Sequence, residues 1–354
     1  MSILFWFGFL TIIFGLLALD LGVFHKQDAE PSAREALGWT FVWVLVAVAF
    51  AGFIYGAYDR HWFGIGLDGT GAVIASGREA ALQYLTGYLI EYTLSMDNIF
   101  VIALIFGFFH VPPRYQHRVL FWGILGAIVM RGAMIIAGAA LVARFTWIIY
   151  VFGGFLVLTG LKMLVAKTED VDLNQNVLVR FTRRLVPVTE RFHGQHFLVR
   201  AGSQAGREPA VPGAEILPDR MIESARPGAL LATPLLLALV MVEVTDVIFA
   251  VDSIPAIFAI TTDPFIVLTS NLFAILGLRA MYFMLAGMAD RFSLLKYGLA
   301  LVLVFIGTKM LLIDLYPIPV PFSLGVVAVI IATSIVLSLR RDARQRAGEA
   351  VRQN

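Results

Sequence analysis

The amino-acid sequence predicts an all-α, polytopic membrane protein of about nine transmembrane helices, in which two groups of three helices are inverted repeats. Three observations support this fold class. The 354 residues are 59% hydrophobic and only 15% charged, whereas a soluble domain carries about 25% charged residues. Apolar stretches recur at the length that a bilayer requires, and the basic residues collect on one side of the predicted spans.

Each predicted span is an apolar stretch of near twenty residues, enough to cross the hydrocarbon core at about 1.5 Å per helical residue. The first stretch lacks the positively charged start of a secretory signal, so we expect it to be retained as a helix. The predicted spans are 3–24, 39–58, 83–109, 118–142, 146–165, 229–258, 265–288, 295–314 and 320–339. They divide the chain into an N-terminal two-helix segment with an outer loop (1–82), a first three-helix unit (83–165), a basic loop (166–228), a second three-helix unit (229–314), and a last helix with a basic tail (315–354).

The basic residues predict the orientation. If the run after Leu339 faces the cytoplasm, nine spans place the N-terminus outside and the C-terminus inside. The inner side then holds most of the Lys and Arg residues, and the outer side holds only Arg60, Arg78 and Arg144. This asymmetry agrees with the enrichment of Lys and Arg in cytoplasmic loops.

The segment 166–228 is the one sizeable water-soluble part that the sequence predicts, and it lies in the cytoplasm. Its basic residues are expected to be solvated or to contact lipid headgroups, so no nucleic-acid partner is expected. His193 and His196 are most simply polar surface residues, because a structural metal site normally needs four ligands. The chain has no cysteine, which excludes disulfides, thiolate nucleophiles, iron–sulfur clusters and thiolate zinc sites.

The two three-helix units carry similar acidic motifs. EYTLSMDNIFVIALIF begins at Glu91 and DVIFAVDSIPAIFAI begins at Asp246. Four further landmarks recur in order: the second acids Asp97 and Asp252, the polar residues Asn98 and Ser253, the arginines Arg131 and Arg279, and the lysines Lys162 and Lys309. A unit of three spans that occurs twice must be inverted relative to its copy. Inverted repeats are a recurring plan of secondary transporters, whose site lies near the midplane at the repeat interface.

Ionised side chains in hydrocarbon cost roughly 2.5–3.5 kcal/mol each, so the intramembrane acids need compensation. Carboxylates, an amide, a hydroxyl and backbone carbonyls form an all-oxygen site, which suits Mn²⁺, Mg²⁺ or Ca²⁺. Zinc and copper are less favoured, since the motifs contain no Cys or His. The candidate metal ligands are Glu91, Asp97, Asn98, Glu243, Asp246, Asp252 and Ser253. Secondary or gating candidates are Asn271, Arg131, Arg279, Thr93, Ser95 and Thr245.

In a regular helix the two acids of each motif point in different directions, so they converge on one ion only if the helix is locally unwound. A separation of seven residues keeps Asp246 and Ser253 on one face, whereas a separation of six turns Asp252 about 120° away. We therefore expect a local unwinding, favoured in the second motif by Pro255, which has no N–H to donate. Phe100 holds the equivalent position in the first motif, and a break there is left open. An alternative is that Arg131 and Arg279 neutralise the acids as structural ion pairs.

The chain resembles the TerC family of integral membrane proteins in four stretches: EYTLSMDNIFV (91–101), VEVTDVIFAVDSIPAIFAIT (242–261), SNLFAILGLRAMYF (270–283) and RFHGQHFLVR in the loop. The nine-span layout is similar to the branch that includes bacterial manganese exporters responding to alkaline conditions. This resemblance implies a bacterial cytoplasmic membrane protein that exports Mn²⁺ and protects against manganese excess. Carried over by motif, it implies that the seven candidate metal ligands form the ion site.

The sequence therefore predicts a secondary transporter that exports a divalent cation and has no organic cofactor, and the resemblance implies that the cation is Mn²⁺. Counter-transported protons or another available gradient would drive the export. No G-x-x-x-x-G-K-[ST] phosphate loop appears, so no ATPase of its own is expected. An intramembrane hydrolase with two aspartates is disfavoured, because there is no H-E-x-x-H motif and each repeat carries its own acids, so the protein is not expected to be an enzyme. A second alternative is a membrane assembly or metallation factor without transport activity.

Overall fold

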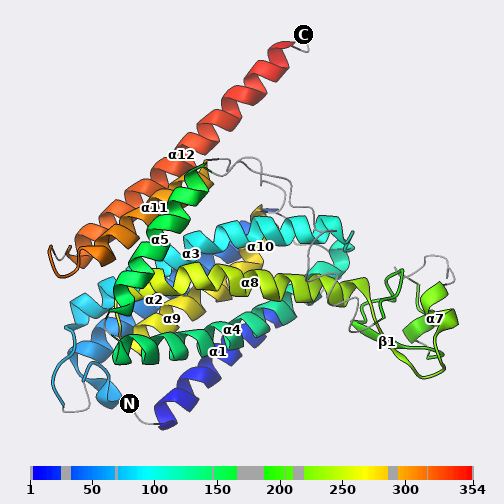
Figure 1. Cartoon of the computed structure of the whole chain (residues 1–354), viewed down its shortest axis with the longest axis horizontal. Helices are drawn as coiled ribbons and strands as arrows, with labels where there is room; N and C mark the ends of the chain where they lie inside the picture. Colours follow the sequence, from blue (N-terminus) through cyan, green and yellow to red (C-terminus); the bar gives the residue numbers. More distant parts are fainter. Residues whose placement is uncertain are drawn as a thin grey trace.

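The computed structural model describes residues 3–24, 33–67, 71–145, 147–165, 187–203, 205–209, 219–285, 294–316 and 318–352. Within these ranges the chain forms a bundle of α-helices with a small two-stranded sheet, which confirms the all-α class (Figure 1). The helices are α1 (Ile3–Phe24), α2 (Ala33–Asp59), α3 (Gly77–Phe108), α4 (Pro113–Arg144), α5 (Ile148–Val165), α7 (Arg220–Ser224), α8 (Pro234–Phe258), α9 (Pro264–Leu276), α10 (Leu278–Leu285), α11 (Leu295–Leu311) and α12 (Val320–Arg352).

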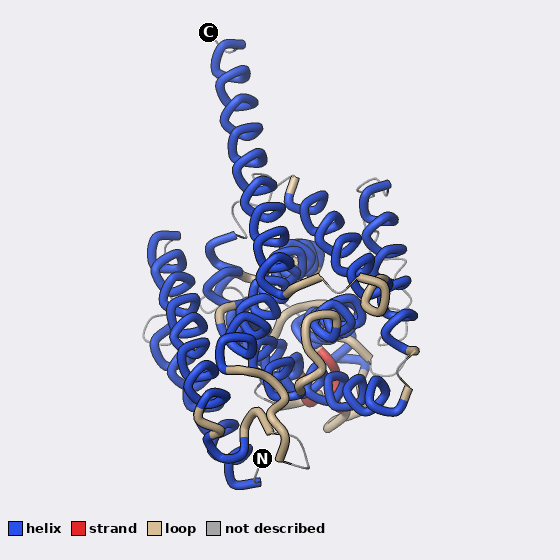
Figure 2. The backbone as a smooth tube through the Cα atoms, turned by 90° about the vertical axis from the view of Figure 1, so that its left-hand side faces the viewer, coloured by secondary structure: helices blue, strands red, loops and turns tan. Residues whose placement is uncertain are grey.

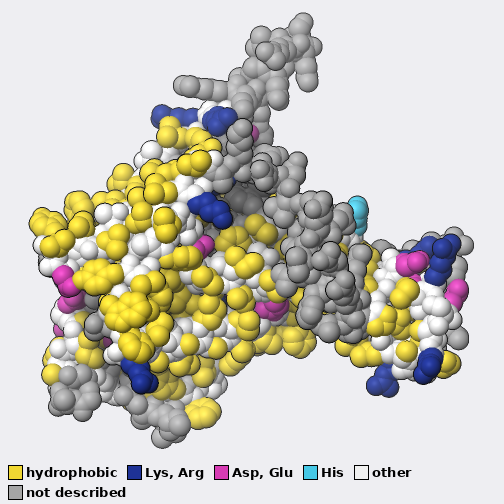
Figure 3. Space-filling view, viewed as in Figure 1, with side chains coloured by type: hydrophobic (Ala, Val, Ile, Leu, Met, Phe, Trp, Pro, Cys, Tyr) yellow, Lys and Arg dark blue, Asp and Glu magenta, His cyan; other side chains and the backbone are white. Residues whose placement is uncertain are grey.

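The described helices make this a polytopic membrane protein. Six of them are long and apolar enough to cross a membrane, namely α2, α3, α4, α5, α8 and α12. The pair α9 and α10 adds a seventh if it is counted as one span bent by 41° at its break. Helices α1 and α11 lie at predicted positions, but the total of nine spans stays a prediction. Apolar side chains cover most of the helical body in the view of Figure 3.

Residue types at the helix ends explain where the helices begin. Helices α4, α8 and α9 each start with a proline, whose fixed φ suits the first turn and whose missing N–H is not needed there. Helix α3 starts after Ser76, whose Oγ accepts a hydrogen bond from the Glu79 N–H at 3.3 Å. The S-x-x-E spacing of these two residues is a helix-start signature.

The predicted span 229–258 begins too early. Strand β2 (Leu230–Ala232) pairs antiparallel with strand β1 (Leu198–Arg200), and α8 starts only at Pro234. Leu231 and Ala232 are fully buried, so their apolar character serves a strand, which hydrophobicity alone does not distinguish from a helix. Strand β2 leads directly into α8, and the small folded part that contains β1 and α7 protrudes at the end of α8 (Figure 1).

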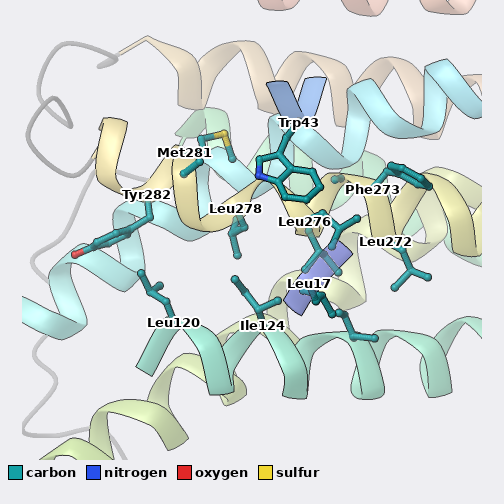
Figure 4. Close-up of a cluster of buried hydrophobic side chains, with 14 of the residues drawn as sticks. Leu17, Trp43, Leu120, Ile124, Leu272, Phe273, Leu276, Leu278, Met281 and Tyr282 are labelled. Carbon is teal, nitrogen blue, oxygen red and sulfur yellow. The ribbon is translucent and has the colours of Figure 1, made fainter. Parts of the chain in front are cut away.

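The interior is a large apolar cluster shared by several spans. Trp43 from α2, Phe273 from α9 and Met281 from α10 lie together, and Leu120 and Ile124 face them from α4 (Figure 4). In the view turned by 90°, the helices lie close together in one bundle, and the C-terminal end of α12 projects away from it (Figure 2). Burial against neighbouring helices therefore fixes how each span is rotated about its axis.

Helix contacts follow a reciprocal pattern. Helix α3 packs against α9 as α8 packs against α4, and the pairs α3–α8 and α5–α11 also touch. In the predicted repeats, α3 is equivalent to α8, the fourth helix to α9 with α10, and α5 to α11. A twofold relation between the units requires these reciprocal pairs. The inverted relation itself stays a prediction.

Glycines allow α5 and α11 to approach closely. A Cβ built at Gly160 would lie 2.7 Å from the carbonyl oxygen of Ala300, so any larger residue there must push the backbones apart. Small residues serve the same purpose at many transmembrane helix interfaces. We expect Gly160→Ala to lower the free energy of unfolding by about 1–3 kcal/mol, as overpacking typically does.

Thermal unfolding in detergent measures this effect. The matched control is Gly154→Ala in the same helix, where an added Cβ meets no atom within 4 Å. Equal unfolding temperatures for the two variants would show that α5 and α11 do not rely on this contact.

Candidate functional site

Both acidic motifs lie on continuous helices, so the predicted unwinding at Pro255 is wrong. Helix α8 runs without a break from Pro234 to Phe258 and includes Pro255. The proline removes only one main-chain hydrogen bond, the one to the carbonyl of Val251, and the helix ends three residues later at Phe258. Helix α3 is likewise continuous through its motif. The acids must therefore meet through side chains, without unwound backbone.

Arg131, in α4, brings acids of the two motifs together. Its Nε and Nη2 donate to the two carboxylate oxygens of Asp246 in α8 at 3.0 and 2.7 Å. Its Nη1 forms an ion pair with Oε1 of Glu91 in α3. The forked contact with Asp246 is the strongest arrangement that a guanidinium makes with a carboxylate. The two acids that open the predicted repeats thus share one cation.

Two amides complete this arrangement. Asn271 of α9 donates to Oε2 of Glu91 at 3.1 Å and accepts from Nη1 of Arg131 at 3.3 Å. The Asn98 amide fits its neighbours best with its oxygen facing Arg131 Nη2 at 3.3 Å and its nitrogen donating to the Leu94 carbonyl at 3.3 Å. We call the five side chains the Arg131 cluster; they are Glu91, Asn98, Arg131, Asp246 and Asn271.

Burial makes the cluster electrostatically important. The side chains of Glu91, Arg131 and Asp246 are 0%, 3% and 13% exposed. Removing one partner of a buried ion pair leaves an uncompensated charge, which costs about 3–5 kcal/mol. With both acids ionised, the three charged groups carry a net charge of −1. The cluster is therefore a cation-attracting position near the middle of α3 and α8.

Asp252 faces a different neighbour. Its Oδ1 accepts from Thr159 Oγ1 of α5 at 3.4 Å, whereas Asp246 contacts α4. The predicted rotation between these two acids is confirmed. Ser253 is 1% exposed, and its Oγ has no hydrogen-bond partner among the described residues.

A small cavity joins the two groups of polar residues. Its volume is about 30 Å³, and it is lined by Asn98, Arg131, Asp252 and Ser253 together with apolar side chains of α3, α5, α8 and α11. A water molecule needs on the order of 10–15 Å³ by this kind of measure. The cavity is therefore large enough for one or two waters, and it connects the Arg131 cluster with Asp252.

The other predicted site residues occupy varied positions. Glu243 is half-buried beside Gly126 of α4, where an added Cβ would overlap its carboxylate. No described residue hydrogen-bonds to Glu243. Thr93 donates to the Leu89 carbonyl of its own helix at 2.7 Å, as expected for a helical threonine. Of the remaining candidates, Ser95 and Arg279 are buried, and Thr245 is half-buried.

Asp97 lies on α3, but its side chain is outside the described part of the chain. In the described ranges, no three Asp, Glu, His or Cys side chains are grouped to hold a metal ion. Convergence of all the acids on one ion thus stays a prediction. In this conformation the guanidinium of Arg131 takes the place between Glu91 and Asp246.

Residues 76–346, which begin just before α3 and reach into α12, match the integral membrane protein TerC family. The chain belongs to the TerC family. A membrane protein of Myxococcus xanthus described as uncharacterized is 47% identical over 334 residues, which cover 94% of this chain and 91% of that protein. A relative from Escherichia coli strain K12, described as a proposed membrane-bound redox modulator named Alx, is 45% identical over 350 residues and 98% of both chains. No solved structure matches the chain.

In this TerC protein, sequence reasoning missed Thr159 and Gly126. Thr159 donates to Asp252, and Gly126 leaves room for Glu243. Neither residue carries a signal of its own, because single threonines and glycines are common in transmembrane helices. Their roles depend on which helices are neighbours, which the sequence motifs do not specify.

The soluble part of the TerC protein contains a further correction. His193 is not a surface residue: it is 4% exposed, and its Nε2 lies 3.4 Å from Oδ2 of the buried Asp219. Asp219 also accepts main-chain N–H groups of Glu190 at 2.9 Å and Met221 at 3.0 Å. The histidine thus belongs to a buried carboxylate network that ties loop segments together. His196 is 38% exposed and lies 3.3 Å from Glu208, as expected for a polar surface residue.

Proposed function

We propose that this TerC protein is a secondary transporter that exports a divalent metal cation, with Mn²⁺ as the favoured ion and protons as counter-ions. The observation that carries the proposal is the meeting of Glu91 and Asp246 on either side of one buried cationic group, near the middle of two membrane helices. Buried intramembrane acids from two similar motifs are typical of an ion pathway.

Ligand chemistry supports a hard cation. Glu91, Asp246, Asp252, Asn98 and Asn271 offer carboxylate and amide oxygens, which suit Mn²⁺, Mg²⁺ and Ca²⁺. The choice of Mn²⁺ among these rests on resemblance to the manganese-exporting branch of the family. The redox description belongs to the relatives. Thiol chemistry is absent from this chain, which has no cysteine.

The order of acids along α8 supports a path. Glu243 lies one helical turn before Asp246, and Asp252 follows nearly two turns later. In the predicted topology, nine spans in the bacterial cytoplasmic membrane, with the N-terminus outside and the C-terminus inside, place the start of α8 in the cytoplasm. An exported ion would then meet Glu243 first, Asp246 with Glu91 next, and Asp252 last.

A reconstituted transport assay tests the proposal. In proteoliposomes that contain a Mn²⁺-quenched dye, the wild-type chain is expected to carry Mn²⁺ faster than empty liposomes. We expect Asp252→Asn to lower this flux by about tenfold or more, because it removes a charge-assisted ligand worth about 1.5–3 kcal/mol.

The control is Asp314→Asn, which removes an exposed carboxylate that accepts from Tyr150 outside the site. It is expected to transport like wild type. Wild-type flux equal to that of empty liposomes would exclude a transporter and leave the assembly or metallation role. Unchanged flux in Asp252→Asn would remove this acid from the pathway.

A further inference from the structure

We infer that Arg131 is a tethered counter-cation, which takes the ion's place between Glu91 and Asp246 when no ion is bound and turns towards Asp252 when the ion binds. The inference rests on the proposed function. The transported ion must then displace the guanidinium of Arg131 before it can bind.

The first argument is the position of the guanidinium. Arg131 contacts both oxygens of Asp246 and one oxygen of Glu91, the two carboxylates that a divalent ion would use. A metal ion cannot bind the same oxygens at coordination distance while the guanidinium covers them. Ion binding at this position therefore requires Arg131 to move.

The second argument is charge. Glu91 and Asp246 together supply −2 when ionised, and Arg131 balances only +1. A divalent cation balances both acids fully, which makes it the better partner for this pair. The displaced guanidinium then needs another carboxylate, because an unpaired charge is costly in a buried membrane site.

The third argument is that such a carboxylate is close. Arg131 and Asp252 line the same cavity of about 30 Å³. The one described hydrogen bond to Asp252 is the 3.4 Å contact from Thr159, which is long for an O–H donor. Ser253 presents a buried hydroxyl to this cavity without a partner among the described residues. A guanidinium turned into the cavity would pair with Asp252 and satisfy Ser253.

A fixed structural ion pair would account for the first contact alone. It would not explain why a second acid and an unpartnered hydroxyl border a cavity beside the guanidinium. The two readings differ in what happens when Arg131 loses its charge. If Arg131 is a fixed structural residue, removing its charge weakens the fold and ion binding together. If Arg131 competes with the ion for Glu91 and Asp246, removing its charge strengthens ion binding.

The test compares Arg131→Gln with wild type by thermal unfolding in detergent over a series of MnCl₂ concentrations. Without metal, the variant is expected to unfold at a lower temperature. Its half-saturating Mn²⁺ concentration is expected to be at least about tenfold lower than that of wild type, because the ion no longer competes with the guanidinium. Flux in proteoliposomes is expected to fall, because nothing then drives the ion from the two acids.

Arg131→Lys gives a second measurement if the glutamine variant does not fold. It keeps the charge but cannot make the forked contact with Asp246, so its half-saturating concentration is expected to lie between the other two. The control is Arg144→Gln, at the exposed end of the same helix, which is expected to behave like wild type.

The outcomes separate this inference from the proposed function. A wild-type chain with neither flux nor a Mn²⁺-dependent shift would exclude both. A wild-type chain that transports and shifts, beside Arg131 variants that bind Mn²⁺ no more tightly, would show that Arg131 is a fixed structural residue and would overturn the inference alone.

Discussion

Replacement of Glu91 by glutamine is expected to lower Mn²⁺ flux about a hundredfold, which corresponds to about 2.8 kcal/mol. The variant loses one of the two charges that face the ion position, and hydrogen bonds to charged groups contribute about 1.5–3 kcal/mol. Glutamine keeps the shape of the side chain and an acceptor for Asn271, while its NH₂ group replaces the oxygen that faces Arg131 and loses that contact. Arg131 keeps Asp246 as its partner, and we therefore expect the variant to fold.

Flux into proteoliposomes and thermal unfolding in detergent together measure this effect. Glu79→Gln is the matched control, because Glu79 is an exposed acid in the first turn of the same helix. It is expected to transport normally. If Glu91→Gln transported at the wild-type rate, Glu91 would be a structural partner of Arg131 with no part in ion binding.

Competition between protons and Mn²⁺ for the carboxylates is expected to change the Mn²⁺ affinity by a factor similar to the effect of Glu91→Gln on flux. Carboxylates must be deprotonated to bind a metal ion, so each proton released on binding lowers the apparent affinity about tenfold for every pH unit of acidification. Mn²⁺ binding should therefore weaken as the pH falls, and two exchanged protons would give about a hundredfold change per unit. Thermal shift with Mn²⁺ at about pH 6, 7 and 8 measures the slope.

The variant Glu91→Gln serves as the control for this slope. It removes one group that exchanges protons, so its dependence on pH is expected to be shallower than that of wild type. Affinity that does not change with pH in the wild-type chain would contradict exchange of metal for protons at these carboxylates.

The sequence by itself determined the helical architecture and most members of the site. A helix satisfies its own main-chain hydrogen bonds in hydrocarbon, so apolar stretches of about twenty residues predict the membrane-spanning helices. The cost of a buried charge marks Glu91, Arg131 and Asp246 as residues that need partners, whatever their neighbours are. Asn271 was also predicted, and it lies in the Arg131 cluster.

Only the tertiary structure decided which of these residues meet. Gly126 leaves room for the carboxylate of Glu243 against α4, and Gly160 lets α5 and α11 approach closely. The packing of α3, α4 and α8 places Arg131 between Glu91 and Asp246. The long arginine side chain spans the gap between continuous helices, so the unwinding expected at Pro255 is not needed. Strand β2 could not be predicted from its own sequence either, because a short apolar run fits a strand or a helix until its pairing partner is known.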